Sequence, residues 1–143
     1  MAKRILAPFD DREPSEAIVP VLGALARDSG ATVRLLRVLP VPELLVGTDG
    51  RIVAYVDQET SRLTAHGTED LRRIEAQLDG VAVESVVRFG EPVAEILLEA
   101  EAFDADLIAL ASPDGGRLRR AIAPGVADRV AARAPVPTLL LRG

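Results

Sequence analysis

The sequence predicts an α/β protein with one doubly wound, mostly parallel five-stranded sheet and helices on both faces. Short apolar runs of strand length alternate along the chain with segments whose apolar residues recur at helical spacing, and this alternation favours a parallel sheet. The chain has 143 residues, which suits a single domain with its own core, so we expect one domain over residues 1–143. Hydrophobic residues make up 48% and charged residues 27% of the chain, as in folded globular proteins.

The first half of the chain supplies two predicted strands and two predicted helices. Residues 4–8 and 32–39 are apolar runs of strand length, as buried parallel strands are. Gly30 is expected to end the helix between them, because glycine adopts the left-handed conformation of a helix C-cap. Residues 40–56 contain prolines and glycines, so we expect a loop with a short hairpin-like element there, before a polar helix over about 58–78. The apolar faces expected for the two helices are Ile18, Val21, Leu22, Leu25 and Ala26 in the first, and Leu63, Leu71, Ile74 and Leu78 in the second.

The second half continues the alternation. Gly90 is expected to turn the chain after a strand, and Pro92 fits the first turn of the helix that follows. The apolar residues of that strand share one parity, which is expected near a sheet edge. The predicted elements are strand 81–89, helix 93–100, strand 106–110, helix 126–134 and strand 136–141.

Composition excludes several classes of function. The net charge of −5 argues against non-specific binding of nucleic acid, and one Tyr, three Phe and no Trp cannot form a surface on which single strands stack. The absence of Cys excludes a disulfide scaffold, a Cys nucleophile and a thiolate zinc site. No apolar run approaches the roughly 20 residues that span a bilayer, and no signal-peptide core precedes Arg4, so we expect a cytoplasmic protein without membrane contact.

Neither a catalytic set nor a metal site is expected. His66 is the sole histidine, and a catalytic or metal role would need partners on the same helix face that the sequence does not supply. A small hydrolase is a further alternative, but its nucleophile would need that one imidazole as its base. Neither the Walker A loop nor the dinucleotide-binding fingerprint is present.

Ligands of such sheets bind at the carboxyl ends of the strands, where the winding reverses, and the first and fourth strands are expected to be neighbours there. Asp10 and the Ala111–Ser112 turn follow these two strands, and Asp10 either hydrogen-bonds a sugar or base or caps a turn. The next loop combines small residues that suit an anion-binding concavity with arginines that add positive charge. These residues are Ser112, Gly115, Gly116, Arg117, Arg119 and Arg120. The alternative is a solvated basic turn with ordinary loop glycines, and from the residues alone we favour it.

Segments spread over essentially the whole chain resemble the universal stress protein family. They are residues 3–10, like the family's first strand ending in Asp; 14–17, like its first helix entry; 90–97, like its Gly-x-Pro turn; 106–108, 118–120 and 126–130, which fit its C-terminal block without a gap; and 134–142, like its last strand. The resemblance implies an adenine nucleotide alpha hydrolase-like sheet and dimerisation through the last strand. It also implies a role in stress response, with ATP bound in some members and not in others.

The ATP-binding members of that family carry Gly-x2-Gly-x9-Gly followed by Ser or Thr, and all four positions differ here. They are Ala111, Asp114, Pro124 and Gly125. The changes place a Cβ, a carboxylate and a residue without an N–H near the expected polyphosphate, and they remove the hydroxyl. A register shifted by one residue recovers two glycines and aligns Ser112, Gly115, Gly125 and Val126 with the pattern. On the adenine side, Asp10 and Val38 still match the family.

We therefore expect a non-enzymatic stress protein that forms a homodimer and acts through protein contacts, with ATP binding weak or lost and no cofactor. The alternative is an adenine-nucleotide sensor that binds ATP or AMP, with or without Mg, through residues 111–126. Residues 136–141 are the expected dimer contact, because an apolar edge strand has unpaired backbone groups that a second copy can cover.

Overall fold

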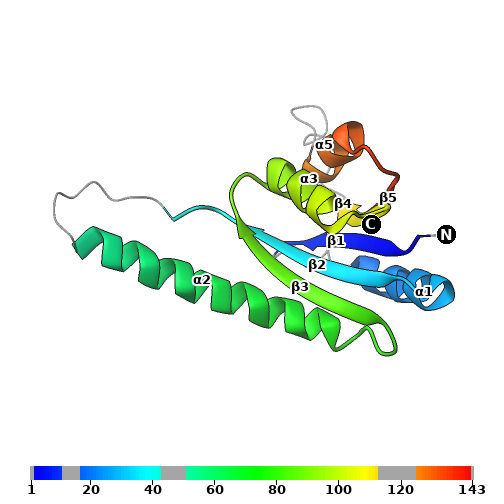
Figure 1. Ribbon diagram of the computed structural model, residues 1–143, viewed down its shortest axis with the longest axis horizontal. Coiled ribbons are helices and arrows are strands. Elements are labelled where there is room, and N and C mark those ends of the chain that lie inside the picture. The colour runs from blue at the N-terminus through cyan, green and yellow to red at the C-terminus, as the bar shows by residue number, and fades with distance from the viewer. Residues whose placement is uncertain (1, 11–16, 43–50, 113–124, 143) are drawn as a thin grey trace.

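The structure is a computed structural model that describes residues 2–10, 17–42, 51–112 and 125–142, with residues 51–57, 112 and 142 described in their backbone alone. One parallel five-stranded sheet has the order β3-β2-β1-β4-β5 (Figure 1). The strands are β1 (Arg4–Phe9), β2 (Thr32–Leu39), β3 (Ala82–Phe89), β4 (Leu107–Ser112) and β5 (Thr138–Arg142). The helices of the described residues are α1 (Val19–Ser29), α2 (Arg51–Glu75), α3 (Pro92–Phe103) and α5 (Val126–Arg133). The predicted doubly wound parallel sheet is thereby confirmed.

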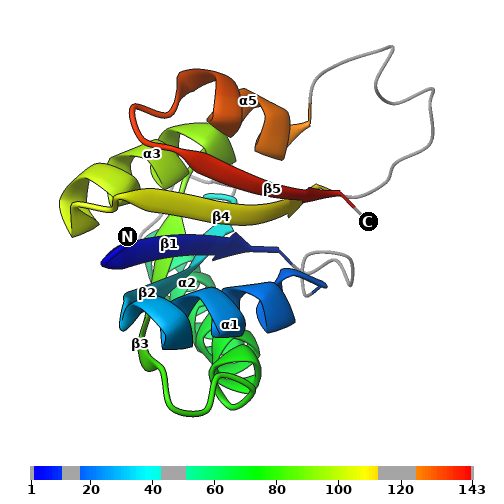
Figure 2. The same cartoon turned by 90° about the vertical axis from the view of Figure 1, so that its right-hand side faces the viewer.

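Helices cover the sheet in two layers. α1 and α2 pack against one face, and α3 and α5 pack against the other (Figure 2). The alternation of side chains along β2 supplies both cores, since Val33 and Leu35 enter the first and Leu36 enters the second. Because both faces of the central strands are occupied, the ends of the strands are left for a site, and ligands of doubly wound sheets bind at the edge where the parallel strands end. We call it the carboxyl edge.

Local signals set the ends of two helices as predicted. Gly30 follows α1 with φ of 68°, in the left-handed region that favours glycine, and its N–H donates to the carbonyl of Ala26. α3 begins with Pro92 in its first turn, and the carboxylate of Glu91 accepts the N–H of Ala94 at 2.8 Å. Both helices therefore begin or end where the sequence places a capping residue.

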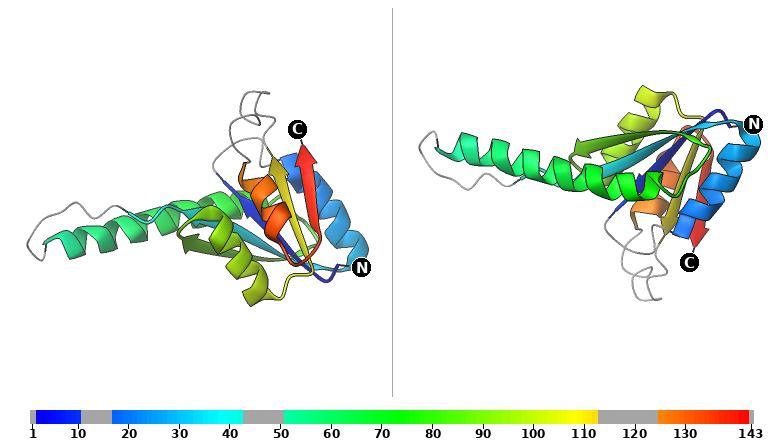
Figure 3. Two further views of the ribbon diagram at one scale, coloured as in Figure 1. Left: turned by 90° about the horizontal axis from the view of Figure 1, so that it is seen from above. Right: turned by 90° about the horizontal axis from the view of Figure 1, so that it is seen from below.

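The prediction for residues 40–56 is wrong in its second half. α2 begins at Arg51, seven residues before the predicted start, and ends at Glu75. The prolines and glycines that suggested a loop all precede Arg51, so they do not interrupt the helix. The amino-terminal part of α2 extends beyond the sheet, as Figure 3 shows from two sides. Residues 43–50 lie outside the described residues.

The predicted apolar face of α1 is too wide. Ile18, Leu22 and Ala26 are buried as predicted, but Val21 is 37% exposed and Leu25 is 38% exposed. The reason is that α1 rests on the sheet along a narrower line, centred on Leu22 and Ala26, and no other helix of the described residues covers its flank. In α2, Leu71 and Ile74 are buried as predicted, whereas Leu63 is half-buried. Leu78 is also buried, but it lies in the turn after Glu75, because the helix ends three residues before the predicted end at 78.

Two arginines of β2 are drawn into ion pairs, one on each side of the sheet. Arg37 pairs with Asp70 of α2 at 3.2 Å. Arg34 pairs with Glu99 of α3 at 3.3 Å and with Glu84 of β3 at 3.2 Å. These pairs tie the helices on both sides to β2 and β3.

Candidate functional site

The predicted neighbours at the carboxyl edge, β1 and β4, are adjacent in the sheet. Their register pairs Ile5 with Leu107 and Leu6 with Ile108 and does not continue, whereas β1 pairs with β2 as far as Phe9. Pro8 contributes to this difference because it has no N–H to donate to a neighbouring strand. The carboxyl halves of β1 and β4 are thus unpaired with each other at the point where the winding of the sheet reverses. Ligands of doubly wound sheets bind at such a point.

The structure places the strand-borne candidates at this edge. Asp10 is exposed directly after β1, and Val38 is half-buried in β2, where it packs against the second core. Ala111 and Ser112 are the last two residues of β4, and they pair with Leu141 and Arg142 of β5. The methyl group of Ala111 packs against the first core. β4 therefore continues as a regular strand through Ser112 rather than turning at Ala111.

The remaining candidates belong to the start of α5. Gly125 is the N-cap of α5, with φ of −70° and no side-chain hydrogen bond to the first turn, and Val126 is the exposed first residue of the helix. α5 returns from the end of β4 to the start of β5, so its amino terminus lies at the carboxyl edge (Figure 2). Gly115 and the arginines at 117, 119 and 120 lie outside the described residues. The structure thus brings Asp10, Ala111, Ser112 and Gly125 to one edge.

Charged groups that sequence reasoning missed join two helices beside this edge. Glu91 accepts the N–H of Ala94, and Arg129 of α5 donates to Glu91 at 3.3 Å. The pKa of Glu91 lies below its ordinary value, chiefly because of the hydrogen bond from Ala94 and, to a smaller extent, because of the charge of Arg129. Asp128 adds a carboxylate to the first turn of α5. Only the capping position of Glu91 before Pro92 was visible as a local signal.

The described residues also bear on metal binding, on the role of His66 and on membrane insertion. Among them, no cluster of three or more His, Cys, Asp or Glu side chains is arranged to hold a metal ion. His66 is exposed on α2, next to Gly67, where the helix approaches β2 and β3 closely. No described helix combines the length and the apolar character needed to cross a membrane.

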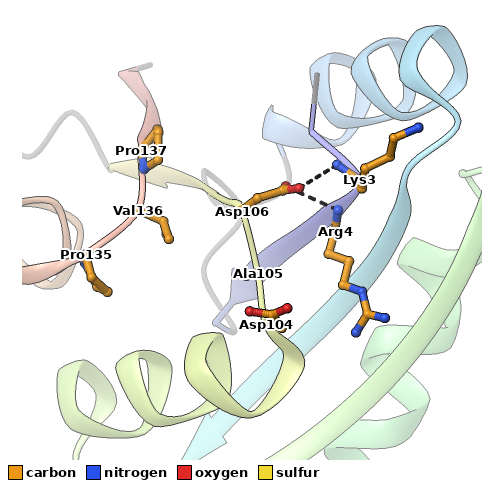
Figure 4. Close-up of a pocket in the computed structure, with 8 residues that line it drawn as sticks. All are labelled: Lys3, Arg4, Asp104, Ala105, Asp106, Pro135, Val136 and Pro137. Carbon is orange, nitrogen blue, oxygen red and sulfur yellow. Dashed lines mark hydrogen bonds between the residues drawn. The ribbon is translucent and has the colours of Figure 1, made fainter.

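A pocket of about 460 Å³ lies at the opposite edge of the sheet, where the strands begin. Figure 4 shows its wall of Pro135, Val136 and Pro137 facing Asp106. The carboxylate of Asp106 accepts the N–H groups of Lys3 at 2.8 Å and Arg4 at 3.2 Å, which holds the starts of β1 and β4 together. None of the predicted site residues lines this pocket.

Comparisons with known proteins assign this fold. A sequence profile described as Universal stress protein family matches residues 1–142. The chain is similar in structure to hypothetical protein MJ0577, with a TM-score of 0.81 and 23% identity over 99% of this chain and 96% of that one. It is also similar to universal stress protein UspA from Lactobacillus plantarum, with a TM-score of 0.76 and 16% identity over 98% and 97% of the two chains. A universal stress protein in complex with cAMP gives a TM-score of 0.67 and 19% identity over 99% and 97%. No curated protein matches the chain significantly.

Proposed function

Because the chain belongs to the universal stress protein family, we propose that it is a non-enzymatic, dimeric member that acts through protein contacts and binds ATP weakly or not at all. Members of this family are not generally enzymes. The observation that carries the proposal is the course of β4. In the ungapped alignment, Ala111 stands where ATP-binding members have their first loop glycine. Here that residue is paired with Leu141, and its methyl group packs into the core.

The start of α5 supports the same proposal. The first-turn N–H groups of a helix attract an anion, but a carboxylate in that turn already offsets part of their positive potential. Asp128 is such a carboxylate. A triphosphate approaching α5 would therefore meet a negative group in the same turn that carries the donors it needs. The sequence adds Asp114 and Pro124 to this unfavourable set.

Calorimetric titration of the purified protein with ATP, ADP and AMP, with and without Mg²⁺, tests the proposal. The matched control restores the ATP-binding pattern; it combines Ala111→Gly, Asp114→Gly, Pro124→Gly and Gly125→Ser. We expect no saturable heat from the parent and measurable ATP binding by the restored variant. Saturable micromolar binding of ATP by the parent would overturn the proposal.

A second candidate is an adenine-nucleotide sensor that uses the register shifted by one residue. Two observations favour it: a solved structure similar to this chain contains cAMP, and no atom of the described residues other than its chain neighbours lies within 4 Å of the place that a Cβ on Gly125 would take. In that register Gly115 and Arg119 belong to the site, so Gly115→Val and Arg119→Ala should each weaken nucleotide binding, as should added salt. This assignment fails if both variants bind a nucleotide as the parent does.

The dimer of the proposal uses the free edge of β5. The two edge strands differ in composition: β3 includes the charged residues Glu84 and Arg88, whereas β5 has three consecutive leucines, Leu139, Leu140 and Leu141. Charged side chains disfavour the pairing of an edge strand with a strand of another chain, and an apolar edge strand without them favours such pairing. Pairing of β5 with the same strand of a second copy would satisfy the free backbone groups of both.

Light scattering of the eluting protein tests this contact. A charge at position 139 or 140 should give a monomer or insoluble protein, and we expect the parent to elute as a dimer. An unchanged dimer in Leu139→Asp refutes the β5 interface.

A further inference from the structure

One flank of α1 carries apolar side chains that nothing in the described structure covers. Arg27, on the other flank, donates from Nε to the carbonyl of Asp79 at 2.8 Å, and so faces the turn between α2 and β3. Leu25 lies two residues earlier, about 200° away around the helix axis. Leu25 and Val21 therefore share the flank that faces away from α2, and we call these two residues the α1 flank.

The α1 flank points along the sheet toward its β5 edge. α2 lies over β2 and β3, on one side of the central β1, and β4 and β5 lie on the other side. Figure 3 shows β5 between α1 and α5. Leu139 and Leu141 of β5 are half-buried and pack against the same core as α1. The exposed α1 flank and the half-exposed leucines thus lie on one side of the sheet, next to its free edge.

Strand pairing alone would make a small interface. A stable protein–protein contact uses roughly 20–30 residues a side and buries on the order of 1,600 Å² in total. β5 has five residues, and only one of its edges is free. A dimer joined at β5 therefore needs neighbouring surface as well, and apolar surface supplies more binding free energy than charged surface does.

From this we propose that the α1 flank is the second contact of the dimer, where a second copy of this chain, joined at β5, covers Val21 and Leu25. The inference rests on the dimer proposed above and adds the helix surface to it. Exposed apolar residues also occur elsewhere, but in a different setting. Leu98 is 51% exposed on α3, among Ala94, Glu101 and Ala102, on the opposite face of the sheet. Leu98 therefore provides a control with the same side chain.

Sedimentation of the full chain at several concentrations measures the contribution of the flank. Val21→Asp and Leu25→Asp should each raise the dimer dissociation constant about tenfold or more, because a charge would be placed in a desolvated contact. Leu98→Asp should leave the constant within about twofold of the parent's. Circular dichroism checks that the variants are folded, and Leu25→Gln replaces Leu25→Asp if the latter is not.

Thiol labelling gives a second readout that does not depend on weakening the dimer. The chain has no Cys, so Leu25→Cys and Leu98→Cys each introduce a unique thiol. We expect the thiol at 25 to react several-fold more slowly when the protein concentration is above the dimer dissociation constant than when it is below. The thiol at 98 should react equally fast at both concentrations.

The outcomes separate this inference from the dimer on which it rests. If Leu139→Asp gives monomers while Val21→Asp and Leu25→Asp dimerise as the parent does, the α1 flank is not a contact and the β5 interface stands. If the parent itself is monomeric at every concentration, the proposed dimer is wrong, and the inference about α1 falls with it.

Discussion

Replacement of Glu99 by Gln should destabilise the fold far more than replacement of its neighbour Glu84. Glu99 is 3% exposed on α3, and its two carboxylate oxygens accept from Arg34 at 3.3 Å and from Arg88 at 2.9 Å. The guanidinium carbon of Arg34 also lies 4.2 Å from the centre of the Phe103 ring. Without the charge of Glu99, Arg34 and Arg88 would remain beside an apolar face with much of the negative charge that neutralises them removed.

The size of the effect follows from the exposure of the partners. Removing one member of a fully buried ion pair costs about 3–5 kcal/mol. Arg34 and Arg88 are 21% and 30% exposed in their side chains and keep second carboxylates, Glu84 at 3.2 Å and Glu95 at 3.6 Å. Solvent screening therefore reduces the expected loss for Glu99→Gln to about 2 kcal/mol. Glu84 is about half exposed, so Glu84→Gln should cost less than about 0.5 kcal/mol.

Thermal and urea unfolding of the two variants measure this difference. For a domain of this size, about 2 kcal/mol corresponds to a fall of roughly 4–8 °C in Tm, against less than about 2 °C for Glu84→Gln. Both variants remove one negative charge near Arg34, so a general charge effect would shift them equally. Equal shifts would refute the argument that burial makes Glu99 the dominant partner.

Two further predictions concern the caps. Gly30→Ala should cost about 1–2 kcal/mol in urea unfolding, because φ of 68° strains a side chain even where space is open, and Gly30→Asn should cost less since Asn tolerates this conformation. Glu91 has a lowered pKa, so its cap stabilises the folded state fully above its unfolded value of 4.5 and loses this effect as the pH falls through the folded value. Glu91→Gln should therefore lower Tm at pH 7 and match the parent in strong acid; an equal deficit at both pH values would contradict this.

Those parts of the fold that depend on local periodicity were predictable. The strands lie within a few residues of their predicted positions, and Gly30 caps α1 because the sequence fixes both the helix and its end. The start of α2 at Arg51 was missed because nearby prolines and glycines outweighed the short apolar run that follows them. The exposure of Leu25 was missed for a different reason: the width of a buried helix face depends on what lies beside the helix, which periodicity does not encode.

The location of the site was predictable, but its interior was not. The rule for doubly wound sheets places Asp10 and Ala111 at the carboxyl edge, and the structure has them there. Two features of the site involve residues far apart in the sequence. They are the early end of the pairing between β1 and β4 and the contact of Arg129 with Glu91. Such contacts arise from tertiary packing, so no local pattern in one sequence reveals them.

The position of Gly125 bears on which register of the nucleotide-binding pattern applies. In the ungapped register Gly125 stands where ATP-binding relatives carry Ser or Thr, and it is the N-cap of α5. Ser and Thr are favoured at an N-cap, because the hydroxyl accepts an N–H of the first turn. In the shifted register that hydroxyl would fall on Val126, already inside the helix, where it could not cap. The helix boundary therefore favours the ungapped register, in which all four positions depart from the pattern.

Serine should have different effects at the two adjacent positions 125 and 126. Gly125→Ser should supply the missing cap and stabilise α5 by a few tenths of a kcal/mol, or about 1 °C in Tm, whereas Val126→Ser should give no such gain. With glycines also restored at 111, 114 and 124, only serine at 125 should strengthen ATP binding in calorimetry. If serine at 126 strengthened it instead, the shifted register would be the correct one, and the case for a nucleotide sensor would replace the case for a site that has lost ATP.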